Sequence, residues 1–162
     1  MLEPIRIHHD GPNLVLASWS DFFFQYWKGD GTIEDCRLMF REHMKFVDSL
    51  HDKKTFSLAH ISMVRFRPPD SGMTDVIRQH GAAINPRTYA GVTVIEADGF
   101  AGAVARGVVS GLTLVRRGAP KLVVETTPLA GIRHLLRHAP PDYPTVDAEE
   151  LTAHYLAAVR NR

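Results

Sequence analysis

The chain contains very little cysteine and no surplus of charge. Of its 162 residues only Cys36 is a cysteine, which excludes a disulfide within the chain and suits a reducing compartment. Lysine and arginine number 19 against 18 aspartates and glutamates, so the chain has no net field with which to hold a polyanion. We therefore expect that nucleic acid is not a partner.

Long hydrophobic runs are also missing. No apolar segment approaches the roughly 20 residues that cross a bilayer, and the first ten residues lack the basic and apolar regions of a signal peptide. These absences predict a cytoplasmic protein with no membrane insertion. The length is typical of one domain whose core is large enough to fold without a disulfide or a metal.

The first part of the chain has the pattern of a meander. Short apolar or alternating stretches at 4–8, 14–17 and 22–27 are separated by turn residues, which predicts three antiparallel strands. Thr32 and Asp35 then form a capping pair, and apolar residues recur at helical spacing as far as about residue 51. This segment is predicted to be an amphipathic helix.

Strands and helices alternate after residue 55. Apolar strands are expected at 56–62, 91–95 and 122–124, and each precedes a helical pattern. Such alternation favours parallel pairing with right-handed crossovers. The predicted fold class is therefore α/β, with a mixed sheet of about six strands, an N-terminal antiparallel meander and helices packed on the sheet.

The C-terminal end of the chain divides into three predicted parts. The α/β domain is expected to occupy residues 1–138, a proline-rich linker 139–146, and a final helix 147–162. Because its apolar residues form a single stripe, this helix is a candidate cover for the sheet of its own subunit or of another.

Asp70, Ser71 and Gly72 open the helix that follows the strand at 56–62. The first N–H groups of a helix are unpaired, so this position favours an anion. In the simpler interpretation, Asp70 or Ser71 only caps the helix. In the other, Ser71 is phosphorylated or its amides hold a ligand's phosphate or carboxylate, with Arg65 and Arg67 close in sequence.

This order of elements, with Asp-Ser-Gly opening a helix after a mid-chain strand, resembles the STAS domains, including the SpoIIAA-like group of anti-sigma-factor antagonist-like proteins. The resemblance covers roughly residues 5–137, and its motif, Asp-Ser-Ser/Thr-Gly in the family, is one residue shorter here. It implies a STAS-like fold that acts through protein partners. It also implies that Ser71 corresponds to the hydroxyl that a partner kinase phosphorylates.

A second helix start lies at Asp98 and Gly99. It carries only part of a dinucleotide-binding glycine pattern, so an aspartate cap with small residues for close packing is the simpler interpretation, and no cofactor is expected. The alternative is that the helix starts at 71–73 and 98–102 bind a small anionic, nucleotide or apolar ligand.

Signs of catalysis or metal binding are weak. His134 and His138 stand four residues apart, but Arg133 and Arg137 beside them oppose a cation, so we expect no metal. Ser110 falls inside a predicted helix rather than at a nucleophile elbow. No acid–base or nucleophile–base pair can be named, and the chain is predicted not to be an enzyme.

The aromatic strand at 22–27 needs a cover on both faces. Phe22, Phe24 and Tyr26 would face one side, while Phe23 and Trp27 would face the other. Either a helix packs over the second set, or Trp19, Phe23 and Trp27 belong to a subunit interface or an apolar ligand groove.

These sequence patterns favour a protein-interaction function over small-molecule binding. The leading hypothesis is a non-enzymatic STAS-like regulatory or interaction module that acts by protein–protein contact, with homodimerisation as one form of that contact and Ser71 as its switch. The alternative is a small-molecule binding domain at the two helix starts.

Overall fold

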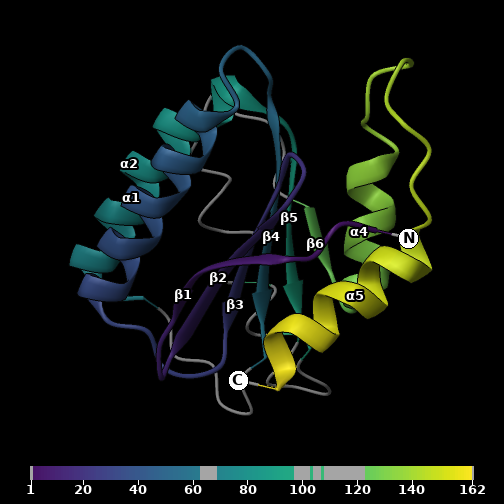
Figure 1. Ribbon diagram of the computed structural model, residues 1–162. Coiled ribbons are helices and arrows are strands. Elements are labelled where there is room, and N and C mark those ends of the chain that lie inside the picture. The colour runs from purple at the N-terminus through teal and green to yellow at the C-terminus, as the bar shows by residue number, and fades with distance from the viewer. Residues whose placement is uncertain (1, 63–68, 97–102, 104–106, 108–122, 162) are drawn as a thin grey trace.

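The structure, a computed structural model, describes residues 2–62, 69–96, 103, 107 and 123–161. Within these residues a six-stranded mixed sheet lies between two pairs of helices, as Figure 1 shows. The predicted α/β class, with a mixed sheet and an antiparallel N-terminal meander, is therefore confirmed. None of the described helices is long and apolar enough to cross a membrane.

The strands are arranged in the sheet in the order in which they occur in the sequence. The first two pairings are antiparallel, and each later pairing is parallel. The strands are β1 (Arg6–Asp10), β2 (Leu14–Trp19), β3 (Phe22–Trp27), β4 (Thr55–Ile61), β5 (Thr88–Ile95) and β6 (Val123–Glu125).

Several strand boundaries differ from the prediction by two or three residues, and two of these differences follow directly from the pairing of the strands. β1 continues to Asp10, beyond the predicted end at residue 8, because a register shift after Ile7 lets His9 and Asp10 pair with β2. β5 starts three residues early, since Thr88 pairs with Thr55 across the sheet. In both cases pairing with the neighbouring strand, rather than the local sequence pattern, determines where the strand begins or ends.

The helices cover the sheet in pairs. α1 (Ile33–Ser49) and α2 (Ser71–Ile84) lie on one face, and α4 (Pro128–Leu136) and α5 (Ala148–Arg160) lie on the other (Figure 1). A short 3₁₀ turn, η1 (Asn85–Arg87), joins α2 to β5. Side chains cap the start of each α-helix, and the predicted capping box of Thr32 and Asp35 is present.

β3 contributes to both cores. Phe22, Phe24 and Tyr26 pack with α4 and α5, and the ring of Phe24 stacks on Tyr155 of α5. Phe23 points to the opposite core, under α1. A helix therefore packs over each face of the aromatic strand, and α5 covers the sheet of its own chain.

The proline-rich segment before α5 is fastened to the sheet. The hydroxyl of Tyr143 donates to the carboxylate of Asp21, and its ring meets Phe56 edge-on. Burial raises the pKa of Asp21, and burial together with that carboxylate raises the pKa of Tyr143. The linker thus holds α5 against the core that contains Phe24 and Leu58.

Gly131 lets α4 approach the sheet closely. A Cβ at this position would lie 2.7 Å from Cγ2 of Val94, a stiff side chain that cannot move away easily. We expect Gly131→Ala to lower the free energy of unfolding, because overpacking costs about 1–3 kcal/mol and the gain in helix propensity is at most about 1 kcal/mol. Urea denaturation measures this loss.

Gly91→Ala is the matched control. Its new Cβ would meet only the carbonyl oxygen of Ser57, at an ordinary 3.9 Å. If the two variants unfold at the same urea concentration, the close contact between α4 and Val94 of β5 does not exclude a side chain at position 131.

Candidate functional site

Asp70 caps α2 and leaves Ser71 at its exposed first position. The Asp70 carboxylate accepts a hydrogen bond from the N–H of Met73 at 2.8 Å, and its carbonyl accepts one from the Thr74 hydroxyl at 2.7 Å. Ser71 is the first residue of the helix and is exposed. The capping role that the sequence assigned to Asp70 or Ser71 therefore belongs to Asp70.

Gly72 brings the start of α2 against the start of α1. A Cβ at position 72 would lie 3.1 Å from Cδ1 of Ile33, tighter than ordinary contact. Further along, Nδ1 of His43 lies 2.9 Å from Nε2 of His80, and Arg87 reaches back to Asp48. Contacts that advance together along both helices mean that α1 and α2 run side by side in the same direction.

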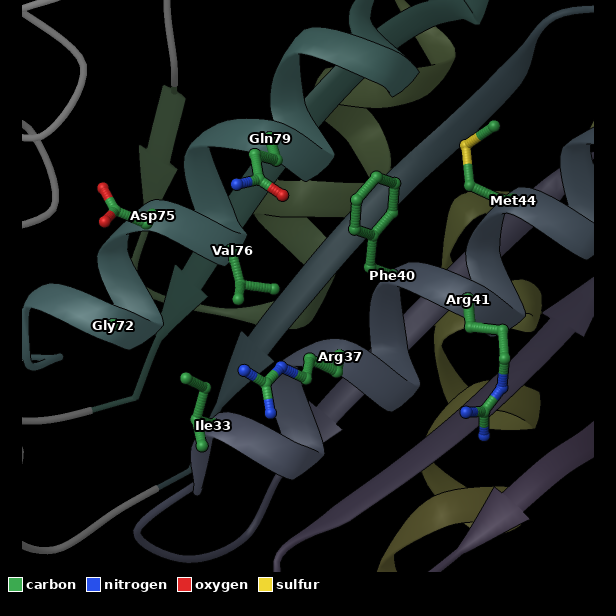
Figure 2. A pocket seen from close by; sticks show the side chains of 9 residues that line it. All are labelled: Ile33, Arg37, Phe40, Arg41, Met44, Gly72, Asp75, Val76 and Gln79. Atoms are coloured by element: carbon green, nitrogen blue, oxygen red, sulfur yellow. The ribbon is translucent and has the colours of Figure 1, made fainter.

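An open groove of about 530 Å³ lies between these helices on their outer side (Figure 2). In Figure 2 the side chains of Phe40 and Val76 project into the space between the helices, whereas Arg41 and Asp75 lie at the outer edges of α1 and α2. We call this the α1/α2 groove. Its lining consists of Ile33, Arg37, Phe40, Arg41, Met44, Gly72, Asp75, Val76 and Gln79.

The two walls of the α1/α2 groove differ in charge. α1 supplies Arg37 and Arg41, and α2 supplies Asp75 and the amide of Gln79. Salt bridges to neighbours on the same helix already engage both arginines and the aspartate. An apolar floor between a basic and an acidic wall can bind an amphipathic protein surface.

A polar cluster fastens α5 at the carboxyl ends of β4 and β5. Nδ1 of His60 lies 3.0 Å from the Tyr155 hydroxyl, and its Nε2 lies 2.8 Å from the Glu96 carboxylate. Arg160 donates to both oxygens of Glu96 at 2.8 Å. We call these four residues the His60 cluster.

Burial and hydrogen bonding act in opposite directions on the pKa values of His60 and Glu96. Burial lowers the pKa of His60, although the hydrogen bond that its Nε2–H donates to Glu96 works in the opposite direction. Burial also opposes the charge on Glu96, but the hydrogen bonds from His60 and Arg160 prevail and lower its pKa. His60 and Tyr155 are fully buried, whereas Glu96 and Arg160 are partly exposed, so the cluster connects α5 to the sheet from the core out to the surface.

A pair of histidines, His43 and His80, connects α1 to α2. His43 is fully buried and stacks on Phe23, with ring centroids 4.1 Å apart. Burial and the neighbouring His80 lower the pKa of His43 well below its usual value. Within the described part of the chain, Nε2 of His43 is buried without a hydrogen-bond partner.

Of the two alternatives that the sequence left open for Phe23, the structure shows the helix cover and not an exposed interface. It has no exposed surface, because His43 and Phe46 of α1 cover its ring. Trp19 and Trp27 are only partly buried, at the edges of the two cores. The apolar face of β3 is therefore used inside this chain.

Other predicted ligand-binding residues lie outside the described part of the chain. These are Arg65, Arg67, Asp98 and Gly99; Ser110, considered from the sequence as a nucleophile and argued against, also lies outside the described residues. The structure therefore places Asp70, Ser71 and Gly72 beside the groove and does not address the second helix start.

The described residues contain no group of three or more side chains able to hold a metal. The rings of His134 and His138 lie 4.5 Å apart, and Nδ1 of His138 bonds to the carbonyl of His134. Cys36 is buried, and this burial raises the pKa of its thiol to about 11, so the thiolate needed of a nucleophile is disfavoured.

The sequence patterns missed both histidine clusters. His60 and Tyr155 are 95 positions apart, and His43 and His80 are 37 apart. His60 stands in an apolar strand, which is a weak signal of burial, whereas His43 and His80 have charged or polar neighbours in the sequence, and no local spacing identifies any partner. Only the packing of helices on the sheet brings these groups together.

No family model and no curated protein matches this chain in comparisons with known proteins.

The buried histidines predict how stability depends on pH. The pKa values of His43 and His60 are lower in the folded chain than the unfolded value of 6.5, so unfolding takes up protons in acid. The free energy of unfolding should be constant at mildly alkaline pH. It should fall below about pH 6.5, each histidine adding a slope of up to about 1.4 kcal/mol per pH unit.

Urea denaturation at a series of pH values measures this slope. His43→Gln should flatten it, whereas His51→Gln, at an exposed position, should not. An unchanged slope in His43→Gln would show that this histidine is not held neutral by the fold.

Proposed function

We propose that this protein is a non-enzymatic, STAS-like interaction module that contacts protein partners through the outer surface of α1 and α2 and is switched at Ser71. One observation carries the proposal: an exposed serine is the first residue of a helix whose next residue, Gly72, lines an open groove with an apolar floor. The resemblance of the Asp-Ser-Gly segment to the STAS motif supports the same assignment.

The chemistry of the position supports a switch. Asp70 already caps the helix, so modification of the Ser71 hydroxyl does not remove a cap. A phosphate at Ser71 would add about two negative charges at the helix end. Asp75 lies one helical turn further along, so the modified wall of the groove would become strongly acidic. Such a change alters the affinity for a partner more than it alters the fold.

The fold supports the proposal only as a scaffold. A mixed sheet with an antiparallel N-terminal meander is compatible with a STAS-like domain, but one α/β architecture serves many functions. The assignment therefore depends on the surface beside Ser71.

A small ligand is the second candidate for the same place. The α1/α2 groove, at about 530 Å³, falls within the range of about 300–1,000 Å³ that is usual for ligand pockets. Its two charged walls would select an apolar molecule with a charged group.

Phosphorylation and contact can be tested together in cells that express the natural protein. A photoreactive amino acid in place of Met44, which lines the groove, should form discrete protein adducts. The same probe in place of Ala157, exposed on α5 across the sheet, should not. Mass spectrometry should find phosphate on Ser71, and Ser71→Asp should change the yield of the Met44 adducts while Ser71→Ala abolishes the phosphate.

The proposal fails if Ser71 carries no phosphate and the two probe positions give the same adducts. Protection of Met44 by a small molecule, without a protein adduct, would favour the ligand-binding alternative.

A further inference from the structure

We propose that the occupant of the α1/α2 groove is a second copy of this chain, packed so that α1 of each copy lies over α2 of the other. This inference rests on the proposed function, because it names the partner of the same surface.

The walls of the groove are complementary to each other. α1 contributes two arginines at its outer side, and α2 contributes Asp75 and Gln79. In a symmetric dimer each copy presents the same patch, so a patch suits self-association when one half of it complements the other half. A basic wall opposite an acidic wall meets this condition.

The direction of the helices determines which residues would meet. A two-fold axis that runs parallel to the helices above the groove exchanges the two walls and leaves the level of each residue along the helices unchanged. Ile33 and Gly72 lie in contact at one level. Arg37 is then about 6 Å further along α1, and Asp75 is about 4.5 Å further along α2.

Arg37 of one copy therefore comes to the level of Asp75 of the other copy, and Arg41, one turn later, comes to the level of the neutral amide of Gln79. Figure 2 places Arg41 and Asp75 at the outer edges of their helices. The two-fold axis lays the outer edge of α1 over the outer edge of α2 of the second copy. Because of the two-fold symmetry, the salt bridge between Arg37 and Asp75 would occur twice in the dimer.

Arg37 and Asp75 can each leave the salt bridge within its own helix and pair with the other copy. The Arg37–Glu34 pair has a separation of 3.7 Å, and the side chains are 61% and 74% exposed. The Asp75–Arg78 pair is about 60% exposed on each side. Exposed pairs of this kind contribute little, so they can be rearranged when a second surface arrives.

The groove floor supplies the apolar part of the contact. Phe40 and Met44 are only partly buried, and both line the groove beside the buried Val76. Covering them with the same side chains of the second copy removes apolar surface from water, which is the main favourable contribution to association.

Charge reversal tests the arrangement in the purified, unmodified protein. The first variant, Arg37→Glu with Arg41→Glu, makes the α1 wall acidic, and the second, Asp75→Lys with Gln79→Lys, makes the α2 wall basic. Light scattering should show a dimer for the natural chain across a wide range of concentration. Each variant alone should raise the dimer dissociation constant at least about tenfold, because like charges then face each other.

The decisive result comes from mixing the two variants. An equimolar mixture should form a one-to-one heterodimer, because each acidic wall then meets a basic wall. The chain with all four substitutions should recover the homodimer. Arg137→Glu, a charge reversal at the C-cap of α4 across the sheet, is the control and should leave the dimer unchanged. Circular dichroism confirms that each variant is folded.

The inference is overturned if the natural chain is monomeric at every concentration. It is equally overturned if a dimer persists in both variants, since the contact then lies elsewhere. The phosphate on Ser71 and any Met44 adduct with a mass other than that of the dimer are measured independently of these results. Failure of the dimer and failure of the proposed function can therefore be told apart.

Discussion

The two-sided burial of β3 is the constraint on which the rest of the structure depends. This strand marks the change from antiparallel to parallel pairing, and large side chains project from both of its faces. Phe24 must be covered on one side and Phe23 on the other, because an exposed aromatic strand would pair or aggregate. α1 meets the second need and α5 meets the first, so the last helix is part of the fold.

Buried polar groups stabilise this arrangement where the helices meet the sheet. His60 connects β4 to α5 through Tyr155 and Glu96, and His43 lies between Phe23 and α2. Since burial favours their neutral forms, both histidines make the packing sensitive to protons. Two of the nine histidines in the chain are fully buried in this way, between the helices and the sheet.

Because helices cover both faces of the sheet, the candidate surface in the described part of the chain is the outer side of α1 and α2. The α1/α2 groove combines an apolar floor, charged walls and a helix start at Ser71. Close approach at Gly72 keeps the two helices in register, and that register gives the surface a defined pattern of charge. This pattern of charge around an apolar floor is the basis of the proposed interaction function.

The sequence by itself determined the class of the fold, the helix caps and the alternation of Phe22, Phe23 and Phe24, because these depend on contacts between residues close in the chain. It also placed Asp70, Ser71 and Gly72 at a helix start. Tertiary structure alone decided which helix covers Phe23, which residues line the groove, and how His60 finds Tyr155. These contacts join residues tens of positions apart, and their geometry follows from how helices pack on a sheet and not from any local pattern.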